Sequence, residues 1–118
     1  MKHSKDPLIT TDIYSILYDL GVSAESTCFF HTAYAVLLAT EDPQKLLLVT
    51  KWLYPEVAHH YRTTWHAVER SIRRVVQLVW TRRSRQLEHF AGQPLFCRPT
   101  PSQFLAILVN RLSHHHAA

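Results

Sequence analysis

The chain has 118 residues, the length of one domain of ordinary size. Hydrophobic residues make up 47% of it and charged residues 19%, which is typical of a globular protein and not of a disordered one. Gly21 and Gly92 are the only glycines, which excludes a glycine-rich phosphate-binding loop. The two cysteines do not have C-x-x-C spacing, and the sequence has neither a signal peptide nor the ~20 consecutive apolar residues of a membrane span. These features predict a cytoplasmic protein without a membrane span.

Charge is distributed unevenly along the sequence. The net charge is +4 with histidines neutral. Residues 1–50 carry three lysines and six acidic residues, whereas residues 51–98 carry nine lysines and arginines and three acidic residues. This basic middle predicts a polyanionic partner, and a solvated basic surface without a partner is the alternative.

Apolar residues recur at helical spacing along almost the whole chain. A first helix is predicted over about 13–20, ending at Gly21, and a second over about 27–40. A third begins at Pro43, with Asp42 as its N-cap residue. Its candidate core residues are Leu46, Leu47, Val49 and Leu53.

The second half of the chain contains the remaining helical segments, the first of which begins at Pro55 as either a new helix or a kink in the preceding one. A short helix covers 55–61, and after a break at 62–64 a long helix runs to about residue 82. The apolar stripe of the long helix consists of Val68, Ile72, Val75, Val76 and Val79. Another short helix starts at Ser84 or Arg85 and ends at Gly92. The last helix opens at Thr100 with a T-x-x-Q capping box.

These elements predict an all-α fold, a compact bundle of about six helices that includes a helix-turn-helix. We expect the domain to cover 8–113, with flexible termini at 1–7 and 114–118.

The predicted helices at 55–61 and 64–82 have the layout of a helix-turn-helix, whose second helix enters the major groove of DNA. Five residues of that second helix share one face by their spacing and are of types that pair with base edges: His66, Glu69, Arg70, Arg73 and Gln77. Arginine pairs with guanine O6 and N7, glutamine with adenine, and glutamate accepts from cytosine. We therefore predict that these residues read bases in double-stranded DNA.

Other residues around the long helix are suited to contact the DNA backbone. They are Arg62, Thr63, Thr64, Arg74, Arg82, Arg83 and Arg85. Residues 62–85 carry seven arginines and one acidic residue, and arginine in place of lysine favours bidentate recognition. The alternative function is a helical protein-interaction module: an antagonist or heterodimer partner of a full-length regulator, or a sigma-factor binder.

Four runs of sequence resemble the motifs of a known family. They are T-K-W-L-Y-P-E-V-A at 50–58, Y-R-T-T at 61–64, V-E-R-S-I-R at 68–73 and P-T-P-S-Q-F-L-A at 99–106. In this order and at these distances they are similar to the C-terminal DNA-binding domain of the stage 0 sporulation protein A response regulator family. The similarity covers about residues 9–113.

The resemblance implies an all-α fold of six helices that reads a short box in bacterial promoters. It also implies homodimers on tandem boxes, contact with RNA polymerase sigma subunits, and a cytoplasmic, nucleoid-associated location. By position, Glu69, Arg70 and Arg73 match family residues on the DNA-reading helix, and Arg74 stands where the family often has histidine. Ala67 replaces a family arginine, so we expect one contact fewer and an altered box preference.

The family's receiver domain does not fit into the six residues that precede Pro7. The chain is therefore expected to be either a stand-alone effector, which the starting Met1 favours, or an excised fragment.

Histidines are the only candidates for a metal site. His59, His60 and His66 lack a cysteine or carboxylate at matching spacing, and the run at 114–116 is expected to belong to a frayed terminus. The sequence also lacks a nucleophile–base arrangement. We expect no enzymatic activity, no cofactor and no metal.

Overall fold

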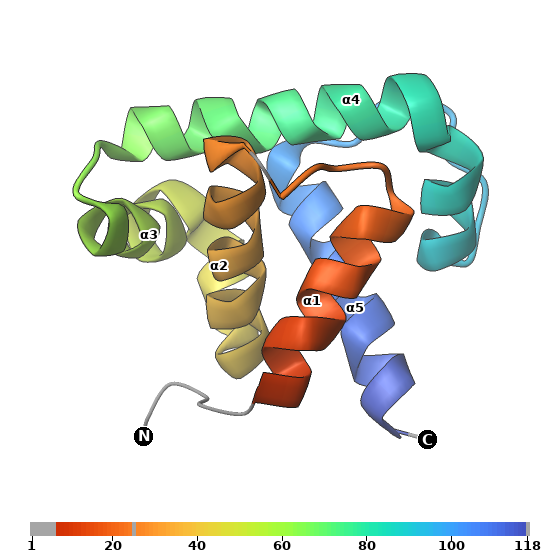
Figure 1. Ribbon diagram of the computed structural model, residues 1–118, viewed down its shortest axis with the longest axis horizontal. Helices are drawn as coiled ribbons and strands as arrows, with labels where there is room; N and C mark the ends of the chain where they lie inside the picture. Colours follow the sequence, from red (N-terminus) through yellow and green to blue (C-terminus); the bar gives the residue numbers. More distant parts are fainter. Residues whose placement is uncertain (1–6, 25, 118) are drawn as a thin grey trace.

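The computed structural model describes residues 7–24 and 26–117, and this part of the chain is helical apart from short connections (Figure 1). Its α-helices are α1 (Pro7–Asp19), α2 (Thr27–Glu41), α3 (Tyr54–Tyr61), α4 (Trp65–Ala91) and α5 (Pro101–Ala117). Between α2 and α3 lie a 3-10 segment, η1 (Pro43–Leu48), and a π-helical segment, η2 (Val49–Leu53). The predicted all-α class is confirmed, and no receiver domain occurs among these residues.

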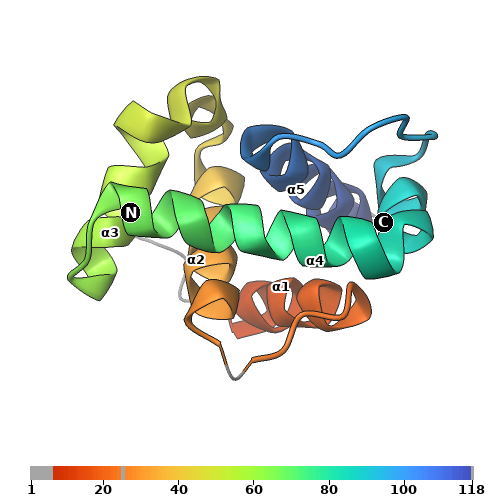
Figure 2. The same cartoon turned by 90° about the horizontal axis from the view of Figure 1, so that it is seen from above.

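The long helix α4 lies across one side of the molecule (Figures 1 and 2). It packs against α2, α5 and α3, with α3 beside its N-terminal end. The core below α4 contains large side chains that are almost completely buried, among them Leu17, Phe29, Ile72, Leu87 and Phe104. Helices from the whole chain share this core. One side of α4 is therefore packed against the core, and its other side faces solvent.

Several predicted helix ends are confirmed by their hydrogen bonds. The Thr64 hydroxyl accepts from the N–H of Ala67 at 3.1 Å, which caps the N-terminus of α4. At the start of α5, the Thr100 hydroxyl accepts from the N–H of Gln103 at 3.2 Å, and the Gln103 side chain accepts from the N–H of Thr100 at 2.9 Å. Gly92 closes α4 with a left-handed φ of 74°.

The segment between α2 and α3 differs from the α-helix predicted there. Asp42 does cap its start, but the backbone winds first as a 3-10 helix and then as a π-helix. A 3-10 helix has about 3.0 residues per turn, and a π-helix is wound more widely, with i→i+5 hydrogen bonds. Side chains at α-helical spacing therefore do not fall on one side of this segment. As a result Leu53 is buried, while Leu47 is 74% exposed and does not belong to the core.

The two helices predicted at 64–82 and 84–92 form one element with a kink. Arg83 has non-helical dihedral angles, φ −137° and ψ 34°, and the helix changes direction there (Figure 1). The sequence has no proline or glycine at this position, and the Arg83 side chain lies against Gly21. A Cβ atom on Gly21 would come within 3.0 Å of the Arg83 Nε atom.

The ends of the chain are described only in part. Residues 1–6 and 118 lie outside the described residues, so the prediction of flexible termini is not addressed there. Pro7 is the first residue of α1, and the helical backbone of α5 continues from Pro101 to Ala117. Among the described residues, no helix combines the length and the apolar character needed to cross a membrane.

Candidate nucleic-acid interface

The helix-turn-helix predicted from the sequence is formed by α3, a turn at 62–64 and α4. Val57 and Ala58 are buried on one side of α3. The helix is terminated by its C-cap residue Arg62, which adopts the left-handed conformation with φ 57°. The N–H of Thr63 then bonds back to the carbonyl of Ala58 at 2.9 Å. This turn holds the N-terminus of α4 close to the end of α3.

The long helix α4 has one buried and one exposed side. The predicted apolar stripe is confirmed, since all five of its residues are at most 2% exposed: Val68, Ile72, Val75, Val76 and Val79. The five residues predicted to read bases lie off this stripe; four of them are exposed and Glu69 is half-buried. We call these five residues, His66, Glu69, Arg70, Arg73 and Gln77, the exposed face of α4.

Local contacts already order this exposed face. The Arg73 Nη2 group donates to the Glu69 carboxylate at 3.2 Å, and the Arg73 side chain remains 62% exposed. The His66 ring stacks on Trp65 with 3.8 Å between ring centroids. These contacts limit the side-chain freedom that a bound partner would have to remove.

The predicted backbone-contact residues fall into two groups along the helix. Arg62, Thr63 and Thr64 lie at its N-terminal end, where the Thr64 hydroxyl is occupied by the N-cap bond. Arg82, Arg83 and Arg85 lie near the kink and are all exposed. Arg74, which is also exposed, lies between the two groups.

The loop between α4 and α5 adds a residue that the sequence prediction missed. Arg98 is exposed, and its Nη1 group donates to the Oε1 atom of Gln77 at 2.9 Å. A polar residue in a loop carries no periodic signal, so only the folded structure places Arg98 beside the exposed face of α4.

Two buried polar side chains beneath the helix-turn-helix were missed as well. His31 on α2 is 4% exposed, and its Nδ1 atom shares a 2.8 Å hydrogen bond with the hydroxyl of Ser71 on α4. Burial lowers the pKa of His31. Tyr54 is 1% exposed, and burial, together with the charge of Glu69, raises its pKa to about 12. Its hydroxyl therefore remains protonated, and it has no hydrogen-bond partner among the described residues.

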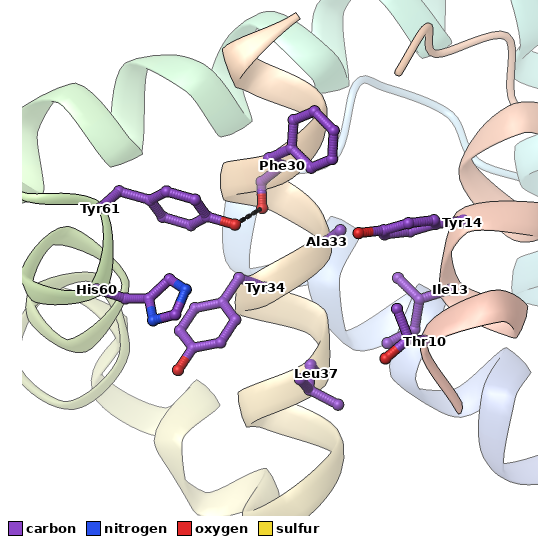
Figure 3. Close-up of a pocket in the computed structure, with 9 residues that line it drawn as sticks. All are labelled: Thr10, Ile13, Tyr14, Phe30, Ala33, Tyr34, Leu37, His60 and Tyr61. Atoms are coloured by element: carbon purple, nitrogen blue, oxygen red, sulfur yellow. Dashed lines mark hydrogen bonds between the residues drawn. The ribbon is translucent and has the colours of Figure 1, made fainter. Parts of the chain in front are cut away.

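Aromatic side chains line a pocket of about 220 Å³ between α1, α2 and α3 (Figure 3). Tyr34 stacks on His60 with 4.1 Å between ring centroids, and the Tyr61 hydroxyl donates to the carbonyl of Phe30 at 3.4 Å. These contacts join α3 to α2. The pocket lacks the charged groups of the exposed face of α4.

The described residues contain no cluster of three histidines, cysteines or carboxylates that could hold a metal ion.

An all-α domain with a capped helix-turn-helix and arginines along its second helix is the architecture of a DNA-binding domain. The comparison with known families agrees with this class. Residues 13–112 match the family described as Sporulation initiation factor Spo0A C terminal, and the chain belongs to this family. It is therefore a DNA-binding effector domain of the sporulation transcription regulators, as the resemblance implied.

Proposed function

We propose that this protein is a sequence-specific transcription regulator in which α4 enters the major groove and reads a short promoter box. The observation that carries the proposal is the division of α4 into two sides. Its apolar stripe is fixed in the core, while Arg70, Arg73, His66 and Gln77 face solvent on a helix held by a helix-turn-helix. The major groove admits one α-helix, and these side chains match the donor and acceptor pattern of base edges.

The length of α4 supports separate roles for its two ends. Residues 64 and 82 lie about 27 Å apart along the axis at ~1.5 Å per residue, more than twice the ~12 Å width of the major groove. We infer that the stretch between the two ends, from His66 to Gln77, reads bases. Arg62 before the helix and Arg82 near the kink then contact the phosphates on either side.

The proposal extends to the partners that family membership suggests. Two copies would bind tandem boxes side by side, and a bound copy would contact an RNA polymerase sigma subunit. The exposed apolar side chains of Leu47, Leu48 and Trp52 are the candidate surface for such a protein contact, since large apolar groups are rarely exposed together without a partner.

Selection of binding sites from random duplexes tests the proposal directly. We expect one short sequence to be enriched. Arg70→Ala and Arg73→Ala should then each cost about 1–3 kcal/mol on that sequence and relax the preference at one base pair. Arg82→Ala should weaken binding to every duplex by a similar factor. A folded wild type that enriches no sequence would contradict the proposal, and complete lack of duplex binding would favour a protein-interaction module instead.

A further inference from the structure

Arg98 is brought to the DNA-reading side of the molecule by the loop that joins α4 to α5. This loop runs back alongside α4 in both views (Figures 1 and 2). Arg98 and Pro99 from the loop line a small cleft of about 90 Å³ together with Arg73 and Gln77 from α4. Two guanidinium groups and one amide therefore converge at this edge of the exposed face of α4.

The loop that carries Arg98 is anchored on both sides of the residue. Before it, the N–H of Leu95 donates to the Glu88 carboxylate at 3.0 Å. After it, Pro99 and Pro101 are buried, and the capping box begins at Thr100. Arg98 is thus held in place before any partner binds, which lowers the entropy cost of a contact through its side chain.

The side chain of Arg98 retains unused donors. A guanidinium has five N–H groups and is always charged, and one N–H of Arg98 donates to Gln77. None of the ion pairs in the described part of the chain involves Arg98. A phosphodiester group is an anion that this planar fork can bind through two parallel hydrogen bonds, and Arg73, which pairs with Glu69, lies in the same cleft.

We propose that Arg98 contacts a DNA phosphate beside the base-reading face and also determines which atoms Gln77 presents to the bases. This inference rests on the proposed function and deepens it. It adds a contact from a loop outside the helix-turn-helix.

The bond to Arg98 restricts the chemistry of Gln77. Arginine has no acceptor, so the amide must turn its oxygen toward Arg98. This bond uses one of the two lone pairs of the oxygen and sets its direction, so the NH₂ group, which can only donate, is the group that Gln77 turns toward DNA. It suits acceptors such as guanine O6 and N7 or thymine O4, whereas bidentate pairing with adenine needs the amide oxygen as well. Gln77 should therefore favour guanine or thymine over adenine.

The experiment compares Arg98→Ala with Arg111→Ala across a salt series. The two variants lose the same charge, but the Arg111 guanidinium lies 4.7 Å from the ring centroid of Phe90 and lines a different cleft, together with residues of α1. Each is measured on the selected duplex and on a scrambled duplex of equal length, after thermal melting has confirmed folding. We expect Arg98→Ala to weaken binding to both duplexes about tenfold. The log–log salt slope should become shallower by about 0.9, one phosphate contact, with no such change in Arg111→Ala. Equal affinity and slope in the two variants would overturn the contact.

Base preference tests the second half of the proposal. The position read by Gln77 is the one at which Gln77→Ala removes the preference. There the wild type should favour guanine or thymine, and Arg98→Ala, which frees the amide oxygen, should gain affinity for adenine relative to them. A wild-type preference for adenine, or no position affected by Gln77→Ala, would overturn the role of Gln77.

The experiment distinguishes failure of the Arg98 contact from failure of the proposed function. If the wild type binds both duplexes equally, sequence reading fails, but the salt slope still decides whether Arg98 contacts a phosphate. If the wild type binds no duplex, both proposals are overturned.

Discussion

Ala67 stands at a position of α4 where the resemblance to the family implies an arginine. It lies in the first turn of α4, is half-buried, and donates its N–H to the N-cap Thr64. Its methyl group ends well short of the reach of an arginine side chain. We therefore expect this protein to tolerate base changes at one position of the box that an arginine would discriminate against.

The substitution Ala67→Arg tests this expectation. It should restore discrimination at one base pair, worth about 1–3 kcal/mol. The fold should persist, because position 67 is outside the apolar stripe and the N-cap bond uses only its backbone. Affinities of wild type and variant for every single-base change of the selected box provide the measurement. Identical profiles would mean that position 67 does not face the groove.

His31 links folding stability to pH through its buried contact with Ser71. Burial lowers its pKa below the ordinary value of 6.5, so the folded protein favours the neutral ring. The unfolded chain binds a proton at about pH 6.5, and unfolding at lower pH is therefore accompanied by proton uptake. The stabilising contribution is complete above this pH and is lost as the pH falls toward the lower folded pKa.

We expect the free energy of unfolding to fall less on acidification in His31→Gln than in wild type. Urea unfolding at about pH 7.5 and about pH 5.5 measures this difference. His59→Gln is the matched control, because His59 is exposed on α3. If His31→Gln and His59→Gln lose equal stability over this range, the buried ring is not coupled to folding.

At the scale of the element, the orientation of α4 predicts opposite results for two neighbouring residues. Ile72 is fully buried, so Ile72→Ala should cost about 2–5 kcal/mol of stability by lost burial and a cavity. Arg73→Ala removes one exposed i,i+4 ion pair with Glu69, which contributes only about 0.3–0.5 kcal/mol. Chemical unfolding of both variants is the check. A large loss for Arg73→Ala with little loss for Ile72→Ala would require α4 to be rotated.

Helical periodicity and capping residues were sufficient to predict most elements and the orientation of α4. At 3.6 residues per turn, Val68, Ile72 and Val79 fall on one side of the helix, and Thr64 and Thr100 each accept a local hydrogen bond that caps the start of a helix. The segment 43–53 was not predictable in this way, because its 3-10 and π windings follow different periods.

Long-range contacts account for the other differences between sequence prediction and structure. The kink is at Arg83, whose side chain lies against Gly21, some 60 positions earlier in the chain. The pairing of His31 with Ser71 and of Gln77 with Arg98 likewise joins residues that are 40 and 21 positions apart. No local pattern encodes such pairs. The exposed side of α4 was therefore predictable from the sequence, whereas the position of Arg98 beside it was not.

At the scale of the whole molecule, the arginines around α4 predict binding that weakens steeply with salt. Each contacted phosphate should contribute a log–log slope of about −0.9, because counterions are released from the duplex. Affinity for the selected duplex over a range of salt concentrations gives the slope. A flat response would exclude backbone contacts, and a steep slope on all duplexes without any preference would leave a non-specific binder.

We propose that arginines on the exposed face of α4 read bases in the major groove. Replacing each guanine of the selected box in turn by 7-deazaguanine removes only the N7 acceptor at the major-groove edge and keeps base pairing. We predict that the wild type loses about 1–3 kcal/mol at one or two of these guanines. The loss at such a guanine should disappear in Arg70→Ala or in Arg73→Ala. Undiminished wild-type affinity for every modified duplex would contradict the claim.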